Sequence, residues 1–75
     1  MQVGQIIGIE VECTQKNDAR LAQILFDLLA HHDFVWYFCQ TATISQAVSR
    51  ARKNGLETEE QRRRVRILTL EDYLP

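Results

Sequence analysis

A helical pattern between two apolar segments constrains the fold more than any other feature of this sequence. Apolar residues recur with the i, i+3, i+4, i+7, i+8 spacing of a helix that packs one side on a core: Leu21, Ile24, Leu25, Leu28 and Leu29. The segment from Met1 to Thr14, most apolar over Ile6–Cys13, precedes this pattern, and Phe34–Cys39 follows it. Strands joined through a helix are usually parallel. The first half of the chain therefore predicts a parallel strand–helix–strand unit.

A second helix and a third strand extend this unit. The motif Thr43-Ile44-Ser45-Gln46 is typical of a capping box with Thr43 as N-cap, and Asn54-Gly55 is a typical helix end. The segment Arg64–Leu70 predicts the third strand, and the unbroken apolar run Phe34–Cys39 predicts a strand buried on both faces. The predicted fold is a single α/β domain, residues 1–75, with the order β-α-β-α-β, a small three-stranded parallel sheet and two helices.

Composition and cysteine placement indicate a reduced, cytoplasmic globular domain. The chain is 45% hydrophobic and 25% charged with a formal net charge of −1, which argues against disorder and against a strongly basic nucleic-acid-binding protein. No apolar stretch approaches the ~18–20 residues of a membrane span. Cys13 and Cys39 both lie in apolar runs, so two buried thiols are expected. Because a three-stranded parallel sheet has two long open edges, association of copies through these edges is also expected.

Basic residues gather in two parts of the second half of the chain. One group is Arg50, Arg52 and Lys53, and the other is Arg62, Arg63 and Arg64 with Arg66 nearby. Such a group often forms only a solvated face. If it has a function, phosphate contact with nucleic acid is the natural one, since arginine and lysine bind phosphate oxygens without reading sequence. The candidate nucleic-acid-binding residues are Arg50, Arg52, Lys53, Arg62, Arg63 and Arg64.

The strongest local motif is Glu10-x-Glu12 with Lys16 shortly after it. Residues two apart in a strand point to the same face, so the two carboxylates are expected to lie side by side on what we take to be a central strand. They could hold Mg²⁺, and Lys16 could contact phosphate, which makes Glu10, Glu12 and Lys16 candidate catalytic residues. The spacing is common, however, and the alternative is an exposed face or pairing with arginines of the last strand.

The stretch Ile9–Lys16, the amphipathic helix after it and the strand Val35–Cys39 together resemble a known family. They are similar to the nuclease-like domain of plasmid replication-relaxation and mobilisation proteins, which is itself similar to the PD-(D/E)XK nuclease fold. The resemblance places Glu10 at the motif carboxylate, Glu12 where lysine is usual, and Gln15 at a glutamine of one branch. The upstream strands and aspartate of that fold have no counterpart here. The resemblance therefore implies a truncated restriction-endonuclease-like core and a plasmid or mobile-element context.

Three functions follow from these observations. The first is a nucleic-acid-associated protein, not catalytic alone, that binds DNA through its basic groups. The second is a small dimerising interaction module with no nucleic-acid role. The third is a Mg²⁺-dependent nuclease whose site is completed by a carboxylate from another copy. Salt-sensitive DNA binding, a concentration-dependent dimer and metal-dependent cleavage distinguish the three.

Overall fold

Three parallel strands form one sheet, as the sequence predicts, and their order across the sheet is β1-β2-β3. The structure is a computed structural model that describes residues 5–73; Gly4 and the start of the predicted first strand lie outside this range. Its elements are β1 (Ile7–Glu12), α1 (Asp18–His31), β2 (Phe34–Cys39), α2 (Ala42–Gly55), α3 (Glu59–Arg63), β3 (Val65–Thr69) and a 3-10 turn, η1 (Leu70–Tyr73). Within residues 5–73, no helix has both the length and the apolar character needed to cross a membrane.

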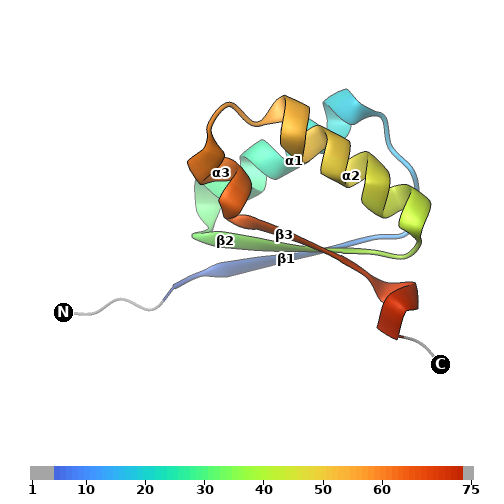
Figure 1. Cartoon of the computed structure of the whole chain (residues 1–75). Helices are drawn as coiled ribbons and strands as arrows, with labels where there is room; N and C mark the ends of the chain where they lie inside the picture. Colours follow the sequence, from blue (N-terminus) through green and yellow to red (C-terminus); the bar gives the residue numbers. More distant parts are fainter. Residues whose placement is uncertain (1–4, 74–75) are drawn as a thin grey trace.

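Both long helices and α3 lie on the same face of the sheet (Figure 1). This arrangement follows from the strand order. The connections β1-α1-β2 and β2-α2-β3 both move to the next strand in the same direction across the sheet. Because crossovers of this kind have the same hand, their helices lie on the same face. The core lies between this helix layer and the sheet. It contains the buried side chains Leu21, Leu25, Leu29, Val35, Tyr37, Cys39, Ile44, Ala47, Val48, Ala51, Leu56 and Val65.

Among residues 5–73 no helix covers the opposite face of the sheet, and this corrects one prediction. β2 is not buried on both faces: Val35, Tyr37 and Cys39 are buried, but Trp36, on the other face, is 36% exposed. The strand order corrects another, since within the described part of the chain β1 pairs with β2 alone and is an edge strand and not a central one. An apolar run thus indicated a strand without showing whether both of its faces are covered.

The N-caps of the helices also differ in part from prediction. Asn17 caps α1 by accepting a hydrogen bond from the backbone N–H of Arg20. α2 begins two residues earlier than predicted, because Thr41 and not Thr43 has the extended backbone and accepts a hydrogen bond from the N–H of Ile44. The capping box is found instead at α3, between Thr58 and Gln61.

Gly8 allows a close approach between β1 and the end of α1. A Cβ atom at Gly8 would lie 2.8 Å from the imidazole ring of His32. That ring is held in place because its Nδ1 lies 2.8 Å from the carbonyl oxygen of Leu28. The strand therefore needs a residue without a side chain at this position.

Candidate functional site

The Glu12 carboxylate lies at the carboxyl end of β1, beneath the helix layer, and is only 5% exposed. The hydroxyl of Tyr37 donates a hydrogen bond to its Oε1 atom over 3.0 Å. Its Oε2 atom accepts from the hydroxyl of Thr14 over 3.2 Å and forms an ion pair with the ammonium group of Lys16. Glu12 is thus a buried charge with one full partner charge and two hydroxyl donors.

These contacts change the pKa values of the residues around Glu12. Burial alone would raise the pKa of Glu12, but the contacts of its carboxylate with Lys16, Tyr37 and Thr14 outweigh burial and hold the pKa below its ordinary value. Burial and the adjacent Glu12 carboxylate raise the pKa of Tyr37. Burial, with a smaller contribution from Glu12, raises the pKa of Cys39 to about 11. The site therefore holds an ionised carboxylate next to a neutral phenol and a neutral thiol.

This arrangement does not assemble a metal centre around the predicted catalytic residues. Glu10 and Glu12 do share a face of β1, as predicted, and that face is the one the helices cover. Within residues 5–73, however, no three side chains among His, Cys, Asp and Glu come together in a way that could hold a metal ion. Lys16 is bound to Glu12 rather than directed toward a separate phosphate site. These polar contacts connect β1, β2 and the turn into α1 and hold them together.

The two cysteines differ in their environments. Cys39 is fully buried, as predicted, but Cys13 is exposed, which corrects the expectation of two buried thiols. Cys13 directly follows the last residue of β1. It continues the alternation of the strand, so it lies on the same side as Ile7, Ile9 and Val11, which all point to the uncovered face. An apolar neighbourhood in the sequence did not reveal this difference, because only one face of the sheet is covered.

Four of the six predicted nucleic-acid-binding residues meet at one open hollow of about 680 Å³. The hollow lies between the second half of α2 and α3, and it is lined by Ser49, Arg52, Lys53, Glu59, Arg62 and Arg63. Four cations and one carboxylate give these residues a formal charge of +3, in a chain whose total formal charge is −1. Folding therefore concentrates positive charge that the net charge of the chain conceals.

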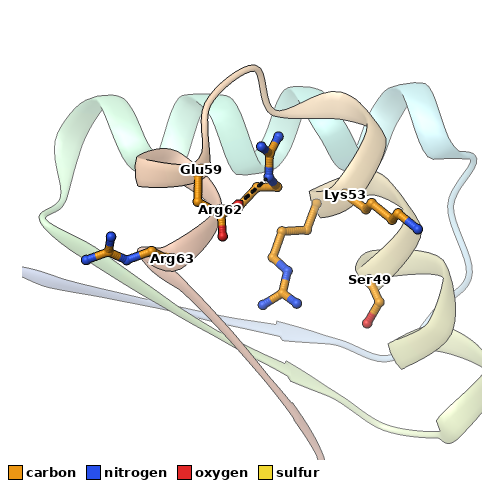
Figure 2. A pocket seen from close by; sticks show the side chains of 6 residues that line it. Ser49, Lys53, Glu59, Arg62 and Arg63 are labelled. Carbon is orange, nitrogen blue, oxygen red and sulfur yellow. Dashed lines mark hydrogen bonds and ion pairs between the residues drawn. The ribbon is translucent and has the colours of Figure 1, made fainter.

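Contacts around the hollow hold part of this charge in place. Arg62 pairs with Glu59 over 3.1 Å and donates to the carbonyl oxygen of Leu56 over 2.8 Å. Arg52 donates to the carbonyl oxygen of Val65 over 3.0 Å. Figure 2 shows the Arg62–Glu59 pair between the Arg63 and Lys53 side chains, which extend away from each other.

Lys53 and Arg63 differ from the two anchored arginines. Both are exposed, and within residues 5–73 neither has a hydrogen-bond or ion-pair partner. Each anchored arginine also keeps N–H groups that its protein contacts do not use, since a guanidinium has five. The hollow thus combines two free cations with two positioned ones.

The other two predicted residues lie elsewhere. Arg50 is exposed on α2 and pairs loosely, at 3.5 Å, with Asp18 at the start of α1. Arg64 binds the carboxyl end of α1: it donates to the carbonyl oxygens of Leu29, His32 and Asp33 over 2.7–2.9 Å. Its guanidinium satisfies carbonyl groups that a helix end leaves without partners. The role of Arg64 is therefore structural.

Sequence reasoning did not find every residue of these sites. Ser49 and Glu59 join the hollow only because α3 folds back beside α2, and nothing in their local sequence marks them. The hydroxyl of Tyr37 contacts Glu12 across 25 residues of sequence, and only the pairing of β1 with β2 brings the two side chains together. The alternation of Glu10 and Glu12 with apolar residues did predict that both carboxylates lie on the same face of the strand.

No protein-family model, curated protein or solved structure matches this chain. The resemblance of Ile9–Lys16 to the nuclease-like domain therefore stays a prediction drawn from a short motif. Any functional proposal depends on the geometry of the chain itself.

Proposed function

We propose that this protein binds nucleic acid through phosphate contacts at the hollow between α2 and α3. The observation that carries the proposal is the convergence of Arg52, Lys53, Arg62 and Arg63 on one open surface. These four residues come from two separate groups in the sequence, and the turn between α2 and α3 brings the groups together. The nuclease-like resemblance of the first strand is consistent with such a partner.

The contacts of the hollow support an anionic and extended partner. Phosphate oxygens accept hydrogen bonds from guanidinium and ammonium groups, and Ser49 adds a hydroxyl donor. Lys53 and Arg63 extend in different directions (Figure 2), so a chain of phosphates can reach both where one isolated anion cannot. The residues that line the hollow supply positive charge, but they do not form a recognisable set of groups that could read the edges of bases. We therefore expect binding with little sequence preference.

Salt dependence provides the first test of this proposal. A duplex that engages all four cations releases about four counterions, which predicts a slope of roughly −3.6 for log K against log salt. The affinity should then fall about 10²-fold between about 50 and 200 mM salt. Fluorescence anisotropy of an end-labelled oligonucleotide measures this directly. No binding at about 50 mM salt would contradict the proposal.

A matched pair of double variants tests the location of the site. Lys53→Ala with Arg63→Ala removes two exposed cations from the hollow, whereas Arg20→Ala with Arg50→Ala removes two exposed cations outside it. Both doubles change the net charge equally. The hollow double should reduce the salt slope by about 1.8, and the control double should leave the slope near that of the unchanged protein. Equal losses in both would show general charge attraction and not a site.

The other two functions have different support. A dimerising module is favoured by the uncovered apolar face of the sheet, which we consider next. A Mg²⁺-dependent nuclease has no comparable observation, because the Glu12 carboxylate already binds Lys16, Tyr37 and Thr14. That function would require cleavage by an oligomer with Mg²⁺ and loss of cleavage in Glu10→Gln.

A further inference from the structure

The face of the sheet opposite the helices is almost entirely apolar. The strand registers place its side chains in three rows across the sheet: Ile7 with Phe34, Ile9 with Trp36 and Arg66, and Val11 with Phe38 and Leu68. Ile9 is 64% exposed and Val11 is 53% exposed. In Figure 1 all three helices lie above the sheet, and among residues 5–73 only the η1 turn, past the end of β3, extends below it. A contiguous exposed apolar patch of this kind is often functional, as a contact surface.

The single charged residue in these rows does not require the partner surface to be polar or negatively charged. The guanidinium of Arg66 lies 5.9 Å from the centre of the Trp36 ring, within range of a cation–π contact. Arg66 lies on β3, an edge strand, so its charged end can remain in water when the centre of the face is covered. The other seven side chains in the rows are apolar. The partner that matches this surface is therefore another apolar face.

A second copy of the chain provides such a face with the matching shape. Two identical sheets have the same twist, and sheets with the same twist pack face to face at about 10 Å with their strands roughly 30° apart. A two-fold axis near the middle of β2 would place the aromatic side chains of one copy against those of the other. Such a contact is isologous, because the same surface is used on both sides.

The size of the face indicates how strong this contact can be. Three strands of about six residues cover on the order of 300 Å² of sheet plane per copy, at ~4.8 Å between strands and ~3.3 Å per residue. The face holds eight residues in its rows, against about 20–30 residues per side in a standard stable interface, so the contact belongs to the weak, transient class. The expected assembly is a dimer that forms and dissociates with concentration, not a permanent one.

We propose that two copies of this protein associate through the uncovered sheet face centred on Trp36, giving four layers with helices on both outer surfaces. This association is distinct from pairing of strand edges, because it buries side chains of the face instead of adding backbone hydrogen bonds. It is independent of nucleic-acid binding, since the basic hollow lies on the helix side of the sheet.

Trp36 is the only tryptophan of the chain and lies in the middle of the proposed contact, so its emission reports on the contact directly. Sedimentation and Trp36 emission are measured together from about 1 µM to about 1 mM protein. The proposal predicts that mass rises from monomer toward dimer, and that Trp36 emission shifts to shorter wavelength over the same range. A monomer throughout would overturn the proposal. A dimer that leaves Trp36 emission unchanged would also overturn it, in favour of edge pairing.

Three substitutions locate the contact. Ile9→Lys and Val11→Lys each add a charge to the face at an exposed position, and each should weaken self-association at least about tenfold, since an unpaired charge would be buried. Phe26→Lys is the matched control, because Phe26 is 51% exposed on α1, away from this face. Circular dichroism confirms that each variant is folded. Dimers that persist in both face variants, or that are lost in Phe26→Lys alone, would overturn the proposal.

Discussion

The hydroxyl of Tyr37 on β2 donates a 3.0 Å hydrogen bond to the Glu12 carboxylate on β1, within the layer between sheet and helices. Both residues are buried, and their contact joins an edge strand to the centre of the sheet. A buried carboxylate is stable only if its oxygens have partners, so this contact connects the polar motif of β1 to the stability of the fold. Several measurable properties depend on it.

Tyr37→Phe should lower the free energy of unfolding by about 1.5–3 kcal/mol, because a buried charged acceptor loses one donor while the ring stays in place. Urea unfolding at neutral pH measures this change. Tyr73→Phe removes a hydroxyl that is on an exposed residue and should change stability by less than about 0.5 kcal/mol. If the two variants were equally stable, the Tyr37–Glu12 hydrogen bond would contribute nothing.

The lowered pKa of Glu12 predicts how stability depends on acid. Because its pKa is lower in the folded than in the unfolded chain, its stabilising contribution is complete above the ordinary value of 4.5 and is lost as pH falls through the folded value. Glu12→Gln should therefore be much less stable than the unchanged protein at neutral pH, and the difference should shrink below about pH 4.5. Unfolding curves across pH test this. Glu57→Gln, at an exposed position, is the matched control and should change stability at neutral pH by less than about 0.5 kcal/mol.

Arg64 and Arg63 are adjacent arginines with opposite expected effects. Arg64→Ala should cost about 1–3 kcal/mol of stability, because three carbonyl groups at the end of α1 lose their donor. Arg64→Lys should recover only part of this, since an ammonium group cannot reproduce the planar fork. Arg63→Ala should leave stability unchanged and weaken DNA binding. Thermal unfolding with anisotropy separates the two roles, and a reversed pattern would contradict the assignment.

Gly8→Ala should destabilise the protein by about 1–3 kcal/mol, because the added Cβ would overlap the His32 ring. The double variant Gly8→Ala with His32→Ala provides the control, since it removes the atoms that the new methyl group meets. Its loss should be smaller than the sum of the two single losses. Additive losses in denaturant unfolding would show that the close approach is not the cause.

The two thiols should react at very different rates. Cys13 is exposed, whereas Cys39 is fully buried and its pKa is raised to about 11, which keeps the thiol protonated. A thiol reagent at neutral pH should modify one equivalent quickly and the second only as the chain unfolds. Cys39→Ala should retain the fast phase and lose the slow one. Two fast equivalents would contradict the burial of Cys39.

Much of the local structure follows from patterns that neighbouring residues set. The spacing of Leu21, Leu25 and Leu29 predicts α1, and these three residues are its buried side. Strand alternation predicts that Glu10 and Glu12 share a face. Both patterns work because side-chain direction depends on backbone geometry over a few residues.

The candidate sites were less predictable because their contacts join distant parts of the chain. Arg64 binds carbonyl groups that lie 31–35 residues earlier, and its position within a basic run did not distinguish it from Arg63. The hollow requires α3 to pack beside α2, although each basic group is visible in the sequence. Charge grouping could thus nominate the residues but not choose among them.

The sequence by itself determined the order of the three strands and the two main helices along the chain, the apolar side of α1 and the opposite directions of the Glu12 and Ile9 side chains. The tertiary structure decided which of those directions is buried. Because the strands lie in the order β1-β2-β3, both helices cover the Glu12 face and leave Ile9 and Trp36 on the open one. A carboxylate can occupy the covered face because Tyr37 and Lys16 reach it there. Alternation shows that two faces differ, but only the placement of the helices shows which one meets water.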